Sequence, residues 1–173
     1  MKSFTKILSA LFIILLALPA FASASQFRIT QVYDGDTVKA ETADTVIYIL
    51  LVGIDAPEVS APDDRNSQPF GKEAKNFLSH RILDKVVEVD GYGKAEYPHN
   101  NILGMIYLNG KNINLEMVDN GLAEVFASPI PKGLDIQPFL NAQTMARQEK
   151  KGMWVLGDKY TSPSQWRRDH QKK

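Results

Sequence analysis

Five short strand-forming runs occupy much of the chain before residue 110 and limit the folds open to it. The runs are rich in β-branched and aromatic residues, and turn dipeptides such as Asp34-Gly35 and Asn109-Gly110 follow some of them. They span residues 27–33, 37–40, 45–54, 86–89 and 102–108. Within the third run, residues 46–52 show no polar face, which predicts burial on both sides. Five short strands in one domain can close into a small barrel.

Apolar residues at helical spacing predict three helices. The first begins near Phe70, the second ends near Gly121, and the third ends at Gly152. Their apolar stripes are Phe70, Ala74, Phe77 and Leu78; Leu115, Val118 and Leu122; and Phe139, Ala142 and Ala146. The order is three strands, one helix, two strands and two helices. This order predicts a mainly β fold with α-helices that cover a five-stranded Greek-key barrel.

The first 24 residues have the pattern of a secretory signal peptide. Lys2 and Lys6 precede an apolar run at 7–18, and Ala22-Ser23-Ala24 has the small residues of a cleavage site. The alternative is an uncleaved anchor, but that run is shorter than the about 20 residues that span a bilayer. We therefore expect cleavage after Ala24, a secreted or periplasmic location, and no stable membrane insertion of the mature protein.

Composition restricts the chemistry of the mature chain. We expect one domain at 25–160, a solvated basic tail at 161–173, and a monomer.

The 173 residues include 20 basic and 20 acidic ones, and loss of residues 1–24 leaves 18 basic residues and a net charge of −2. No bulk positive field would gather nucleic acid, so binding would depend on local cations or on a metal. The absence of cysteine excludes disulfides, thiolate metal sites and a cysteine nucleophile.

Two acidic clusters follow predicted strands, Asp34-Gly35-Asp36 after the first and Asp55 to Glu58 after the third. Taken alone, the first reads as a hairpin turn and the second as a strand end before Pro57. A Greek-key barrel can bring the two strand ends together, and the carboxylates would then repel one another unless a cation joined them. Oxygen ligands without nearby His or Cys favour Ca²⁺ or Mg²⁺ over zinc.

Several stretches together resemble the thermonuclease (staphylococcal nuclease-like) family. They are residues 32–38, 51–58, 68–74, 114–123, 151–154 and 162–167, and they occur in the same order as in that family. The resemblance covers nearly all of the mature chain. It implies a five-stranded OB-fold barrel with three helices and a Ca²⁺-dependent phosphodiesterase acting on DNA, RNA or smaller nucleotides.

The resemblance also implies the roles of four residues. Asp36 and Asp55 match the carboxylates that bind the metal ion, and Ala56 matches the position whose backbone carbonyl completes its shell. Glu58 matches the acid that positions or deprotonates the attacking water. The chemistry is consistent, because the ion polarises a phosphoryl oxygen while the acid directs water at the phosphorus.

Two expected arginines are replaced. Leu50 and Asn101 occupy the positions where the family carries the guanidiniums that bind phosphate. Weak activity is therefore one expectation, and the alternative is an inactive OB-fold module that binds nucleic acid, metal or a protein partner. Possible substitutes for the missing cations are Arg65, Lys94 and His99.

Overall fold

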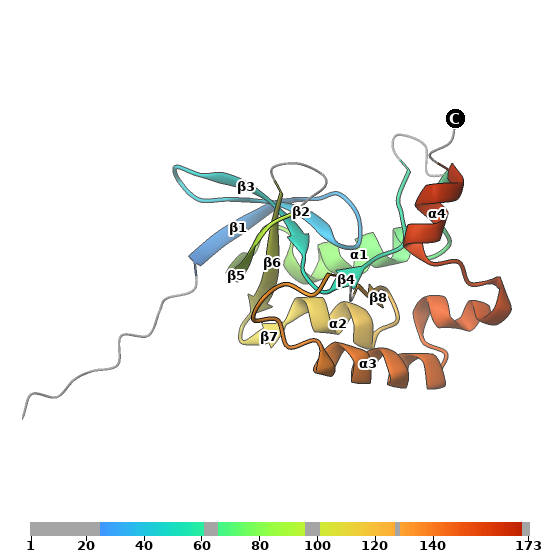
Figure 1. Ribbon diagram of the computed structural model, residues 1–173. Helices are drawn as coiled ribbons and strands as arrows, with labels where there is room; N and C mark the ends of the chain where they lie inside the picture. The colour runs from blue at the N-terminus through green and yellow to red at the C-terminus, as the bar shows by residue number, and fades with distance from the viewer. Residues whose placement is uncertain (1–24, 61–65, 96–100, 127–128, 171–173) are drawn as a thin grey trace, which may run out of the picture.

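The computed structural model describes residues 25–60, 66–95, 101–126 and 129–170 (Figure 1). The predicted signal peptide, Arg65 and His99 lie outside these described residues. The strands are β1 Ser25–Val32, β2 Thr37–Glu41, β3 Val46–Leu51, β4 Ile54–Asp55, β5 Val86–Lys94, β6 Asn101–Leu108, β7 Lys111–Asn112 and β8 Glu124–Val125. The helices are α1 Gly71–Ile82, α2 Ile113–Asp119, α3 Gln137–Gln148, the 3₁₀ segment η2 Gly152–Lys159 and α4 Pro163–His170.

The barrel forms from the five strands that the sequence predicted. Their order is β3-β2-β1-β5-β6, and a parallel pairing of β3 with β6 closes the ring. This closed barrel with several helices confirms the predicted mainly β OB-like fold. Helices α1, α2 and α3 lie together beside the barrel, whereas α4 lies near β4 (Figure 1).

The predicted burial of residues 46–52 on both faces is wrong for β3. Its side chains alternate, with Ile49 and Leu51 buried and with Val46 54% exposed and Tyr48 40% exposed. A barrel strand has only one inward face, so an apolar run there presents every second side chain to the outside. The apolar outer face of β3 explains why the periodicity of this run was hidden in the sequence.

Helix α1 buries one stripe of side chains. In α1, the buried residues are Ala74, Leu78 and Ile82, which follow the predicted helical spacing. Phe70, which the sequence placed at the helix start, is instead the N-cap with a φ of 71°. The helix therefore begins at Gly71, which agrees with the predicted start near Phe70.

A buried asparagine in α2 joins the barrel to the segment that leads to β4. Asn114 is fully buried, and its side-chain oxygen accepts a hydrogen bond from the Ile106 N–H at 3.0 Å. Its amide donates to the carbonyls of Val52 and Gly104, both at 3.0 Å. Because Val52 directly follows β3, these bonds fix the start of the acidic segment relative to β6.

Replacing Asn114 with alanine is expected to lower the free energy of unfolding by about 2–4 kcal/mol, since three buried backbone groups lose a hydrogen bond. For a chain of this size that corresponds to a fall in Tm of roughly 10 °C. Thermal and denaturant unfolding measure it. The matched control is Asn112→Ala, which removes one N-cap bond to Leu115 and should cost about 1 kcal/mol. An equal or larger loss from Asn112→Ala would contradict the assignment.

Candidate active site

The turn between β1 and β2 holds the first acidic cluster. Asp34 Oδ1 accepts hydrogen bonds from the N–H groups of Asp36 at 3.0 Å and Thr37 at 2.6 Å, as in an Asx-turn. The side chain of Asp36 is 8% exposed, and its Oδ2 accepts a 2.7 Å hydrogen bond from the Ala56 N–H. The hairpin-turn interpretation thus fits Asp34, while Asp36 faces the second cluster.

Glycine in this turn permits the close approach of the two clusters. A Cβ at Gly35 would lie 2.6 Å from the Ala56 Cβ and 2.8 Å from the Ala74 Cβ. Real Cβ atoms do not pack so closely, so any side chain here would push the turn away from α1 and from the segment after β4. The Asp-Gly pair therefore serves packing as well as the turn.

The second cluster extends from β4 into the following loop. Asp55 is 5% exposed and pairs with Glu124 of β8 across the short sheet. Glu58 lies beyond Pro57, and its N–H donates to Gln68 Oε1 at 3.1 Å. The Glu58 carbonyl in turn accepts from the Gln68 N–H at 2.9 Å. These bonds hold the backbone of Glu58 while its side chain remains about one-third exposed.

Two carboxyl groups of the site, those of Asp36 and Glu58, have raised pKa values. Burial raises the pKa of Asp36 well above its ordinary value, and the negative charges of Asp34 and Asp55 raise it further. Burial also raises the pKa of Glu58, against the opposing effect of a nearby arginine. Both shifts have the same main cause, because burial disfavours the charged form of a carboxyl group.

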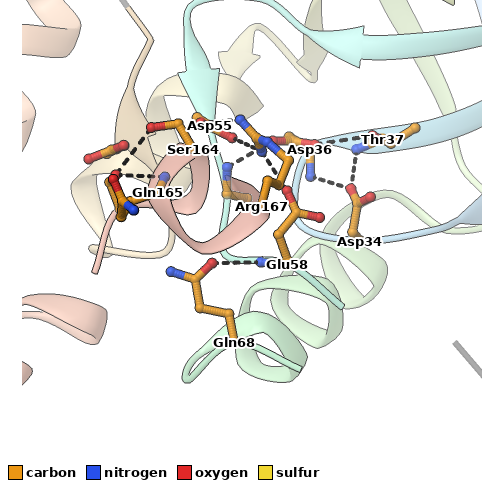
Figure 2. A network of polar contacts seen from close by, with 12 residues as sticks. Asp34, Asp36, Thr37, Asp55, Glu58, Gln68, Ser164, Gln165 and Arg167 are labelled. Carbon is orange, nitrogen blue, oxygen red and sulfur yellow. Dashed lines mark hydrogen bonds and ion pairs between the residues drawn. The ribbon is translucent and has the colours of Figure 1, made fainter. Parts of the chain in front are cut away.

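That arginine is Arg167, which reaches the site from α4 (Figure 2). Its Nη1 donates to Asp55 Oδ1 at 2.8 Å, and its Nη2 donates to Asp55 Oδ2 at 2.9 Å. Nη1 also donates to Glu58 Oε1. The expectation that this end of the chain is solvated is therefore wrong for Arg167. The signal in the sequence was the Trp166-Arg167 pair within the stretches that resemble the family.

The carboxylate oxygens of this site meet some of the requirements of a binding site for a hard divalent cation. Among the residues that the structure describes, no three His, Cys, Asp or Glu side chains form a metal-binding group. Asp36 and Asp55, however, are two buried carboxylates whose negative charges interact, and oxygen donors of this kind suit Ca²⁺ or Mg²⁺. Both oxygens of Asp55 are bonded to Arg167 in this structure. A metal role for Asp36, Asp55 and the Ala56 carbonyl remains a prediction.

The two positions that lack arginine differ in their surroundings. Leu50 of β3 is half-buried and pairs with Thr37, whose hydroxyl donates to Asp36 Oδ1 at 3.1 Å. Asn101 is 6% exposed at the start of β6. Lys94 is exposed at the end of β5, and in the described ranges the ion pairs of Asp55 and Glu58 are with Arg167 instead.

Comparison with known proteins identifies related sequences. The family model described as "Staphylococcal nuclease homologue" matches residues 48–155. An "Uncharacterized endonuclease" of Haemophilus influenzae is 35% identical over 143 residues, which are 82% of this chain and 72% of that protein. Another of the same name from Escherichia coli is 30% identical over 142 residues, 81% of this chain and 84% of that protein.

A fungal relative is longer than the bacterial pair. The "Probable endonuclease LCL3" of Pyricularia oryzae is 32% identical over 131 residues. These residues are 72% of this chain and 49% of the fungal protein. The family match covers more than half of this chain and includes Leu50, Asp55, Glu58 and Asn101. The chain belongs to the staphylococcal nuclease homologue family.

Proposed function

We propose that this protein is an exported nuclease that hydrolyses phosphodiester bonds of DNA or RNA with the help of a divalent cation, with Ca²⁺ as the expected ion. The observation that carries the proposal is the convergence of Asp36, Asp55 and Glu58 at one site in a nuclease-family barrel. Relatives named endonucleases support the reaction class. Export rests on the sequence pattern of residues 1–24, and no helix among the described residues has the length and apolarity to cross a membrane.

The residues divide the chemistry between them. Asp36, Asp55 and the Ala56 carbonyl would hold the cation, which polarises a phosphoryl oxygen when bound. Glu58 lies beside them with a partly exposed carboxylate, so it can orient a water and accept its proton. The bonds from Gln68 to the Glu58 backbone keep this carboxylate at the edge of the site.

A specific observation favours a second candidate, an inactive binding module. Neither Leu50 nor Asn101 can donate a charged hydrogen bond to phosphate, and Arg167 takes both oxygens of Asp55. Loss of one preorganised donor of the oxyanion-hole type costs about 10²–10³ in rate. If catalysis has decayed, the barrel could still bind nucleic acid, a metal or a protein partner.

Digestion of end-labelled single-stranded DNA and RNA distinguishes the two. We expect cleavage with millimolar Ca²⁺, none with EDTA, and recovery when Ca²⁺ is restored, because the two buried carboxylates require a cation. A matched preparation of Asp55→Asn controls for contaminating nucleases and should not cleave. Absence of Ca²⁺-dependent cleavage from the unaltered protein would reject the nuclease proposal and leave the binding module.

A further inference from the structure

We propose that Arg167 is the phosphate-binding residue of this site, so that the C-terminal helix α4 supplies the cation that Leu50 and Asn101 do not. The inference rests on the proposed nuclease function and names a residue that contacts its substrate. It follows from where the guanidinium lies, from the donors it has free, and from the charge around it.

Arg167 lies against both of the carboxylates to which the proposed reaction assigns a role. One guanidinium nitrogen of Arg167 donates both to Asp55, a proposed cation ligand, and to Glu58, the proposed water-handling acid. The scissile phosphate must lie between these groups, because the cation polarises its oxygen and the water attacks its phosphorus. Arg167 is therefore within reach of a phosphate that occupies the site (Figure 2).

Arg167 also has hydrogen-bond donors that Asp55 and Glu58 do not use. A guanidinium has five N–H groups, and three of its hydrogen bonds here go to Asp55 and Glu58. With respect to the described residues, the Nε hydrogen and one Nη2 hydrogen remain. The side chain of Arg167 is 35% exposed, while the side chain of Asp55 is 7% exposed. About one-third of the Arg167 side chain is therefore open to solvent. When Asp55 binds a cation, a second edge is freed to donate to phosphate oxygens, a geometry that suits bidentate recognition.

The charge of the site also favours a phosphate contact through Arg167. Asp34, Asp36, Asp55 and Glu58 form a group of interacting carboxylates, of which Arg167 pairs with the last two. The predicted mature chain has a net charge of −2. A phosphodiester that approaches such a site is repelled unless a cation faces it. The neighbouring Arg168 is exposed and donates to Gln165, so it contributes only to the general field. It provides a matched control on the same helix.

Equilibrium binding tests the inference without relying on turnover. The probe is a fluorescein-labelled single-stranded thymidine oligomer with cleavage-resistant phosphorothioate linkages, measured by anisotropy with the full chain in Ca²⁺. We expect Arg167→Ala and Arg167→Gln to raise Kd by about 10-fold or more, since each removes a charged hydrogen bond to phosphate. The slope of log K against log salt should fall by about 0.7, the value of one phosphate contact on a single strand.

Arg167→Lys should retain the salt slope, because it keeps the charge, and bind more weakly than the unaltered protein, because it cannot form the bidentate pair. Arg168→Ala should change Kd by less than about threefold, as expected for an exposed charge. Equal effects of Arg167→Ala and Arg168→Ala, or an unchanged salt slope in Arg167→Gln, would overturn the inference. So would failure of the unaltered protein to bind the oligomer.

A structural role of Arg167 in docking α4 is separable from phosphate binding. If Arg167 only docks α4, Arg167→Ala and Arg167→Gln should lower the Tm measured by thermal unfolding. Only the loss of a phosphate contact should also lower the slope of log K against log salt. The two proposals also fail differently. If the protein binds through Arg167 but never cleaves, the nuclease proposal fails and this one stands. If it cleaves and Arg167→Gln binds normally, this inference fails alone.

Discussion

Replacing Glu58 with glutamine is expected to lower the rate of phosphodiester cleavage by about 10²–10⁴-fold, the usual contribution of a positioned acid or base. Glutamine has nearly the same shape, and its Oε1 can still accept the hydrogen bond that Arg167 donates in this structure. It cannot accept a proton from the attacking water. We therefore expect the rate to fall while the fold, the melting temperature and the position of α4 are kept.

The matched control is Glu73→Gln on α1, an exposed glutamate in the first turn of that helix. Both variants lose one negative charge, so the difference between their single-turnover rates isolates the chemistry of Glu58. Affinity for the phosphorothioate oligomer should be unchanged or slightly higher in Glu58→Gln, because repulsion of phosphate falls. Cleavage that survives Glu58→Gln at the level of Glu73→Gln would show that another group handles the water.

Local patterns made the barrel predictable. Each barrel strand lies within, or overlaps, a run rich in β-branched and aromatic residues. The acids lie at or just after strand ends, because polar residues and proline end strands. What failed was the prediction of exposure. The run 46–52 is apolar on both faces, and only the closure of β3 on β6 decides which side chains point inward. Periodicity carries no information about pairing partners.

The site was predictable where its residues are close to strand ends, and not where distant segments meet. Asp36 and Asp55 are joined through the backbone of Ala56, a contact that two neighbouring strand ends favour. Arg167 is separated from Asp55 by 112 residues and reaches it only because α4 folds back onto β4. No spacing rule predicts such a contact. The substitutes Arg65, Lys94 and His99 remain predictions, the first and third outside the described residues.

Leucine at position 50 offers the sharpest test of how much the missing arginines matter. Leu50 pairs directly with Thr37 in the β2–β3 ladder, so their side chains share a face of the sheet. The Thr37 hydroxyl contacts Asp36, and the adjacent Leu51 N–H donates to the Asp36 carbonyl at 2.8 Å. Because Leu50 is only half-buried, an arginine there can extend its guanidinium toward the acids without burying an unpaired charge.

Leu50→Arg is expected to raise the cleavage rate by about 10²–10³-fold, the effect of one preorganised donor on the transition state. The matched control is Val46→Arg, which adds the same charge on the same face of β3 but about 13 Å further along the strand; it is 54% exposed and should change the rate little. Equal gains from the two variants would show a general charge effect rather than a contact with phosphate.

Combining Leu50→Arg with Arg167→Gln tests whether positions 50 and 167 contact the same phosphate. If Arg167 already binds the phosphate, Leu50→Arg should produce a larger gain in the Arg167→Gln background than in the unaltered protein, because two guanidiniums that contact one phosphate are partly redundant. The four cleavage rates of this double-mutant cycle, measured in Ca²⁺, give the coupling directly. Strictly additive effects would mean that the two side chains act at separate places, and that α4 contributes to the site through docking rather than through contact with substrate.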